Sequence, residues 1–159
     1  MKKKILKGVL CIGILTLMLA CNDKKEEAVL IDKEQIKKEI QAKEDEFAAT
    51  YNAGEVKEIG FYADDAVSYY QNTPPVVGKK AITEFLIADL AASSNKISFK
   101  TKEVFVSNDG NQVLETGEFQ VNDSTNATIN KGNYMSLFEK RNGKYVCVRD
   151  MSASDLTAK

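Results

Sequence analysis

The stretch from Asn95 to Asp150 decides the fold, because it is a series of strand-like segments separated by turns. Four segments alternate side chains with the two-residue period of a strand: KISFKTKEVFVS (Lys96–Ser107), QVLETGEFQV (Gln112–Val121), GNYMSLFEKR (Gly132–Arg141) and KYVCVRD (Lys144–Asp150). Asp109-Gly110 and Asn142-Gly143 are hairpin turn signals, whereas Asn122–Lys131 is polar and is interpreted as a long loop. The stretch therefore predicts consecutive antiparallel strands.

The residues before this stretch predict helices that cover one face of a sheet. The segment Asp32–Asn52 begins with a capping pattern, places Glu44 away from its apolar face, and carries that face on Ile36, Ile40, Phe47 and Tyr51. A shorter helix is expected over Glu55–Tyr62, a short strand over Ala66–Gln71 and a third helix over Gly78–Ser93. This order predicts an α+β fold with N-terminal helices packed in a strongly curved antiparallel sheet.

The composition excludes several classes of function. The chain has 159 residues and a formal net charge of -1, which gives no basic surface for nucleic acid. Histidine is absent, so the most common general base and metal ligand is missing, and no Ser-His or Cys-His pair can form within the chain. The three cysteines have no metal-binding spacing. We therefore expect neither a metal nor another cofactor.

The N-terminus has the pattern of an exported bacterial lipoprotein. Residues 1–20 combine four lysines with a run of about 16 mostly apolar residues, too short for a membrane span, which needs about 20. Met18-Leu19-Ala20-Cys21 resembles a lipobox, which implies cleavage before Cys21 and lipidation of Cys21. The alternative is an ordinary signal peptide followed by a coincidental cysteine.

Residues 21–30 are interpreted as a flexible tether between this anchor and a single domain over residues 31–159. Lys25-Glu26-Glu27 resembles the surface-export signal of Bacteroidota lipoproteins, although a solvated linker has the same composition. The expected location is the bacterial outer membrane, to which lipid on Cys21 would attach the protein. The protein would face either the periplasm or the cell exterior.

The order of several short motifs resembles NTF2-like domains of the SnoaL-like or DUF4440 group. These motifs are FAATYNAG (47–54), FYADDA (61–66), VGKKAI (77–82), VLETGEF (113–119), GKYVC (143–147) and RDMSAS (149–154). The resemblance implies a cone of helices and bent sheet with a pocket at its open end. Because the group includes both enzymes and non-enzymatic modules, the fold alone does not decide the function.

Ketosteroid isomerase belongs to the same superfamily, and its catalytic positions can be carried over through these motifs. The resemblance places its aspartate base at Tyr70, its oxyanion-hole tyrosine at Phe47 and its protonated aspartate at about Met135. Phe47 and Met135 can neither move a proton nor stabilise an oxyanion. Steroid-isomerase chemistry is therefore not expected.

Glu115 and Arg149 are the candidate polar site residues on the strand faces that we expect to point inward. Glu115 shares a strand face with Val113 and Phe119, and Arg149 shares one with Tyr145. Burial would raise the pKa of Glu115 toward the range of a useful base. The alternative is a structural ion pair, or side chains that reach water.

Four tyrosines could supply hydroxyl groups to the rim of a pocket: Tyr51, Tyr69, Tyr70 and Tyr134. Tyrosines in such positions also serve simply as core or rim packing. The candidate ligand-binding set is Tyr51, Tyr70, Glu115, Tyr134 and Arg149.

Three functions remain open from the sequence. The first is a lipid-anchored module that binds a small apolar or amphipathic ligand, or a partner protein, without catalysis. The second is an enzyme of isomerase, dehydratase or cyclase type that uses Glu115 or Tyr70, with Arg149 as electrostatic support. The third is a structural envelope component that forms a homodimer through its sheet.

Overall fold

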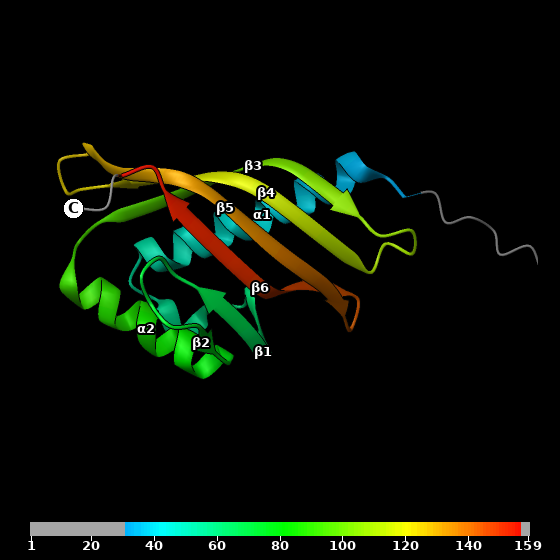
Figure 1. The fold of residues 1–159 in the computed structure, drawn as a ribbon, viewed down its shortest axis with the longest axis horizontal. Coiled ribbons are helices and arrows are strands. Elements are labelled where there is room, and N and C mark those ends of the chain that lie inside the picture. The colour runs from blue at the N-terminus through cyan, green and yellow to red at the C-terminus, as the bar shows by residue number, and fades with distance from the viewer. Residues whose placement is uncertain (1–30, 157–159) are drawn as a thin grey trace, which may run out of the picture.

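The computed structural model describes residues 31–156, which form one six-stranded sheet and the helices that cover its inner face (Figure 1). The strand order is β2-β1-β6-β5-β4-β3. The elements in chain order are α1 (Lys33–Asn52), a 3₁₀ turn (Val56–Glu58), β1 (Tyr62–Tyr69), β2 (Val76–Val77), α2 (Lys79–Ala92), β3 (Lys96–Val106), β4 (Gln112–Asn122), β5 (Thr128–Arg141) and β6 (Lys144–Ser154).

The sheet combines an antiparallel series with one parallel pair. Strands β3 to β6 follow one another antiparallel, as the sequence predicts, and β1 runs parallel to β6. In Figure 1, α1 crosses behind the long strands, and α2 lies with β1 and β2 below them. The α+β architecture with N-terminal helices and a curved sheet is therefore confirmed.

Helix α1 begins where the capping pattern predicts. The carboxylate of Asp32 accepts a hydrogen bond from the backbone N–H of Gln35 at 2.9 Å, which satisfies one of the free donors of the first turn. Its buried face comprises Ile40, Glu44, Phe47, Ala48 and Tyr51. The expectation that Glu44 lies away from this face is wrong, because its side chain is only 2% exposed.

Side chains of α1 also satisfy the free edge of the sheet. The amide of Asn52 donates to the carbonyl of Ile97 and accepts from its N–H, both at 2.8 Å. Gln41 accepts from the N–H of Thr101 at 2.8 Å and donates to the carbonyl of Phe99 at 3.2 Å. These bonds cover backbone groups of β3 that would otherwise be unpaired, and they fix the helix along that strand.

Two β-bulges reverse the alternation of inward and outward side chains. On β3, Thr101 pairs with Gly117 and Glu103 pairs with Thr116, so Lys102 is an extra residue. On β6, Cys147 pairs with Phe138 and Arg149 pairs with Leu137, so Val148 is extra. A bulge bends its strand and increases the local twist. Both bulges occur in strands that curve around α1.

The connections differ from the sequence prediction in two places. The expected helix over Glu55–Tyr62 is only the 3₁₀ turn, and Tyr62 instead begins β1, which extends the expected Ala66–Gln71 strand toward the N-terminus. The expected loop over Asn122–Lys131 is a tight turn, because Asp123 accepts hydrogen bonds from the backbone of Thr125 and Ala127. By contrast, Asn142 and Gly143 form the predicted hairpin turn, with φ of 51° and 79°.

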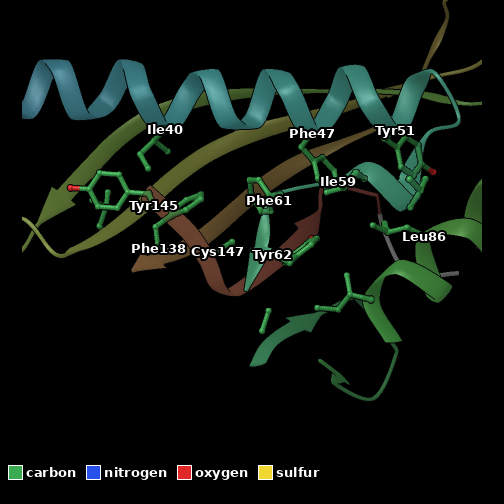
Figure 2. Packing of buried hydrophobic residues seen from close by; sticks show 14 residues of the cluster. Ile40, Phe47, Tyr51, Ile59, Phe61, Tyr62, Leu86, Phe138, Tyr145 and Cys147 are labelled. Atoms are coloured by element: carbon green, nitrogen blue, oxygen red, sulfur yellow. The ribbon is translucent and has the colours of Figure 1, made fainter. Parts of the chain in front are cut away.

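The core lies between α1 and the inner face of the sheet (Figure 2). Ile40, Val113, Phe138 and Cys147 are fully buried, and Phe47 contacts rings of Phe61, Tyr62 and Phe99. Within residues 31–156, neither helix is long and apolar enough to cross a membrane.

Candidate functional site

A cavity of about 610 Å³ lies between the helices and the inner face of the sheet. This size falls within the roughly 300–1,000 Å³ range of small-molecule sites. Residues of α1, α2, β1 and the four long strands contribute to its wall. Nine aromatic rings line it: Phe47, Tyr51, Phe61, Tyr62, Tyr70, Phe85, Phe99, Phe119 and Tyr134.

Two buried glutamates meet at the side of the cavity where α1 faces β4. Glu44 lines the cavity, whereas Glu115 is 0% exposed and lies behind the lining. One oxygen of Glu115, Oε1, accepts from the Thr101 hydroxyl at 2.5 Å and from the Tyr134 hydroxyl at 2.7 Å. A glycine is required at position 117, because a Cβ there would lie 2.4 Å from the Tyr134 ring. Gly117 therefore allows Tyr134 to lie across the strand and reach Glu115.

We infer that these two glutamates share a proton. Burial raises the pKa of Glu44 well above its ordinary value, and the adjacent Glu115 charge and hydrogen bond raise it further. Burial also raises the pKa of Glu115, although hydrogen bonds from Thr101, Tyr134 and Glu44 oppose that rise. Glu44 Oε1 and Glu115 Oε2 have no other donor within residues 31–156. Glu44 therefore holds the proton as the acid, and Glu115 carries the negative charge.

A third acid of the wall, Asp150, lies on β6, in register with Ser136 of β5 and, one strand further, with Glu115 of β4. Its Oδ2 accepts from the Tyr62 hydroxyl at 2.9 Å, whereas its Oδ1 is buried and has no partner among the described residues. Burial raises the pKa of Asp150, and the nearby hydroxyls of Ser68 and Tyr62 partly offset that effect. Asp150 thus lines the cavity and keeps one buried carboxylate oxygen without a donor among the described residues.

Tyrosines complete the wall. Tyr70 stacks on Phe85 with ring centroids 4.1 Å apart, and its hydroxyl is buried without a partner in residues 31–156. Burial raises the pKa of Tyr70 to about 12, so it remains a neutral donor. Tyr51 donates to Asp89 of α2, an exposed residue that also contributes to the lining.

The structure brings together most of the predicted site residues. Tyr51, Tyr70 and Tyr134 all line the cavity, and Glu115 is directly bonded to Tyr134. Tyr69, by contrast, is 43% exposed and is not part of the cavity wall. Whether any of these residues binds a ligand remains a prediction.

The expectation that Arg149 points inward beside Glu115 is wrong. The Val148 bulge shifts the parity of β6, so Arg149 is exposed and donates to the backbone carbonyl of Asp65 at 3.3 Å. The Lys102 bulge has the same effect on β3: strict alternation would place Glu103 on the inward face of Ile97 and Phe99, but Glu103 is exposed. Met135, the expected counterpart of the isomerase aspartate, is 40% exposed and lies outside the cavity.

Sequence reasoning missed Glu44 and Asp150. Glu44 did carry a signal, because it lies four residues after Ile40 and three before Phe47, which is helical spacing on the buried face. Asp150 had no such signal, because a bulge leaves no defined mark in the sequence. Within residues 31–156, no group of three or more potential metal ligands lies close enough to hold an ion.

Comparison with known proteins identifies the family. A family model described as the SnoaL-like domain matches residues 45–148. The chain therefore belongs to the SnoaL-like domain family, which lies within the NTF2-like fold group. No curated protein matches the sequence.

Solved structures of low sequence identity share the fold. A protein domain of unknown function with a cystatin-like fold from Nostoc punctiforme is 15% identical, with a TM-score of 0.66 over 79% of this chain and 78% of that one. An NTF2-like protein with a cystatin-like fold from Novosphingobium aromaticivorans is 13% identical, with a TM-score of 0.63 over 79% and 86%. A ketosteroid isomerase-like protein from Erwinia carotovora atroseptica is 16% identical, with a TM-score of 0.62 over 80% and 100%.

The raised pKa of Glu44 predicts that the domain loses stability as the pH rises. Glu44→Gln should remove this loss. Because its pKa is raised, Glu44 binds the proton more tightly in the folded than in the unfolded protein. The stability that this proton binding contributes is lost as the pH rises above about 4.3, the pKa of glutamate in an unfolded chain. A glutamine keeps the shape and a donor but does not titrate. We expect the free energy of unfolding of Glu44→Gln, relative to the unmodified chain, to increase by at least about 1 kcal/mol between pH 4.5 and pH 8.

Urea unfolding at the two pH values measures this difference, with the exposed Glu84→Gln as the matched control. The same relative stability of Glu44→Gln at both pH values would contradict a raised pKa of Glu44.

Proposed function

We propose that this domain binds a small apolar or amphipathic molecule in its aromatic cavity without transforming it. The observation that carries the proposal is the cavity itself, about 610 Å³ in volume and lined by nine aromatic rings. A protein core closes such a space unless something else occupies it, because empty apolar volume costs stability. Its few polar groups, such as Asp150 and Tyr70, would orient the occupant.

Several features favour binding over catalysis. The chain has no histidine. The shared proton between Glu44 and Glu115 is held within the wall, and Glu115 itself does not line the cavity. Phe47 and Tyr70 occupy the positions where the resemblance places the oxyanion-hole tyrosine and the base of ketosteroid isomerase, so that set of groups is not reproduced.

A second candidate function is acid–base catalysis of isomerase or dehydratase type, and one observation favours it. Asp150 has a free buried oxygen and a raised pKa, which suit a general base, and the unpartnered Tyr70 hydroxyl would be a donor. In this alternative, Tyr70 supplies a hydroxyl donor to the pocket, as the sequence predicted, and Asp150 is the base instead of Glu115.

A homodimer through the outer face of the sheet is compatible with either function. Met135 of β5 and Met151 of β6 are directly paired, and they are 40% and 53% exposed on that face. Covering these side chains would remove apolar surface from water. A structural role as an envelope dimer would use the same surface.

We infer from the N-terminal sequence that the domain works at a membrane. Cys21 and the residues before it lie outside the described part of the chain. Their lipobox-like pattern supports a lipid anchor in the bacterial outer membrane, with residues 21–30 as the tether and the domain either periplasmic or surface-exposed.

Filling the cavity should abolish binding of a neutral apolar probe. Val121 lines the cavity from β4, whereas its neighbour Gln120 is exposed on the other face. We expect the mature chain, residues 21–159 with Cys21→Ser, to bind Nile red with a blue shift in emission. Val121→Trp should weaken this binding at least about tenfold, because the indole occupies the space of the probe. Gln120→Trp is the control and should leave the affinity unchanged.

Fluorescence titration measures both affinities, and circular dichroism verifies that each variant is folded. Undiminished Nile red binding by folded Val121→Trp, or no binding by the unmodified domain, would contradict the proposal.

The lipid anchor has a separate test. In cells fed labelled palmitate, the full-length chain should incorporate label and sediment with membranes, and Cys21→Ser should lose both properties because the acceptor thiol is gone. Cys147→Ser is the control, because Cys147 is buried in the domain core. Label on Cys21→Ser would refute the anchor.

A further inference from the structure

Among the described residues, the cavity wall contains acidic side chains and no basic ones. Among its described residues are three acids, Glu44, Asp89 and Asp150, and neither lysine nor arginine. The nearest arginines in sequence to Asp150 are directed elsewhere: Arg141 pairs with Asp65 and Glu139, and Arg149 lies on the outer face. An anionic ligand would therefore find no positive partner in this wall and would be repelled by its ionised acids.

Asp150 is the acid that lacks a full set of partners. Glu44 Oε1 also lacks a donor among the described residues, but Glu44 lies beside Glu115, with which we infer that it shares a proton. Asp89 is exposed and accepts from Tyr51. Asp150 Oδ1 is buried, and no donor reaches it within residues 31–156. A buried carboxylate oxygen without a donor costs free energy, which a ligand that brings a charged donor would recover.

The aromatic rings around the cavity add a second source of attraction for a cation. The face of an aromatic ring carries the negative part of its quadrupole, so it attracts an ammonium group that lies over it. Tyr62 connects the two features, because its ring lines the cavity and its hydroxyl bonds Asp150 at 2.9 Å. The cationic site and the apolar site are therefore parts of one space.

We propose that the ligand is an organic monocation, an ammonium group on an apolar body, whose N–H donates to Asp150 Oδ1 while the body contacts the aromatic wall. This inference rests on the proposed ligand-binding function and specifies the chemical class of that ligand. A metal ion does not fit the same groups, because no set of three potential ligands converges within residues 31–156. A single carboxylate with a free oxygen instead matches a single N–H donor.

Three probes with one phenyl-alkyl body and different head groups test the charge directly. They are 4-phenylbutylamine, which is cationic at pH 7, 4-phenylbutan-1-ol, which is neutral, and 4-phenylbutyrate, which is anionic. Calorimetric titration of the mature chain, residues 21–159 with Cys21→Ser, should rank the amine at least about tenfold tighter than the alcohol, with the carboxylate weakest. This ranking requires no substitution in the cavity.

Asp150→Asn locates the effect. The amide keeps an oxygen to accept from Tyr62 but removes the charge. The amine should lose at least about tenfold in affinity and fall to about the affinity of the alcohol, a larger loss than any change in alcohol binding. Glu84→Gln removes an acid on the exposed side of α2 and should leave all three affinities as they were.

The outcomes separate failure of the cation assignment from failure of the binding function. Equal affinities for amine and alcohol, or full amine affinity in Asp150→Asn, would overturn the cation assignment and leave the cavity as a site for neutral ligands. Failure of all three probes to bind would overturn the proposed binding function and this inference with it.

Discussion

The structure depends on one geometric constraint: four long strands must curve far enough to wrap a single helix. A strand that keeps a strict two-residue alternation cannot bend sharply without opening its ladder. The bulges at Lys102 and Val148 supply the bend, and each one exchanges the inward and outward faces of its strand. These two bulges therefore link the curvature of their strands to the chemistry of the inner wall.

The Val148 bulge gives the two halves of β6 different roles. Before the bulge, Tyr145 and Cys147 face inward and complete the hydrophobic core. After it, Asp150 and Ser152 line the cavity, while Arg149 is exposed and lies outside it. One strand thus supplies core packing at one end of the cone and polar ligand-facing groups at the other.

Burying the acids costs free energy of folding, and hydrophobic packing of the core does not require them. Glu44 and Glu115 reduce that cost by sharing a proton, with Thr101 and Tyr134 stabilising the remaining charge. Asp150 keeps one oxygen unsatisfied among the described residues. Strained or incompletely satisfied groups are characteristic of functional sites, and a ligand donor would complete this one.

The sequence predicts the architecture well and the inner wall only in part. Local signals suffice for α1, α2, the long strands and the Asn142-Gly143 turn, because each depends on neighbouring residues. Alternation along unbulged β4 correctly placed Glu115 inward. It failed for Arg149, because the position of a bulge is determined by contacts across the sheet and not by the strand itself. The inward position of Glu44 was visible in the helical spacing.

Carboxyl carbon chemical shifts, followed by NMR through a pH titration of the mature domain, test most directly whether this wall is lined by buried acids. The structure predicts that Glu44 titrates well above the ordinary value of about 4.3 for Glu, and that Asp150 titrates above the ordinary value of about 3.9 for Asp. It also predicts that the Glu44 titration is mirrored at Glu115, its proton-sharing partner. Ordinary, independent titration of all three groups would contradict the arrangement of the cavity wall.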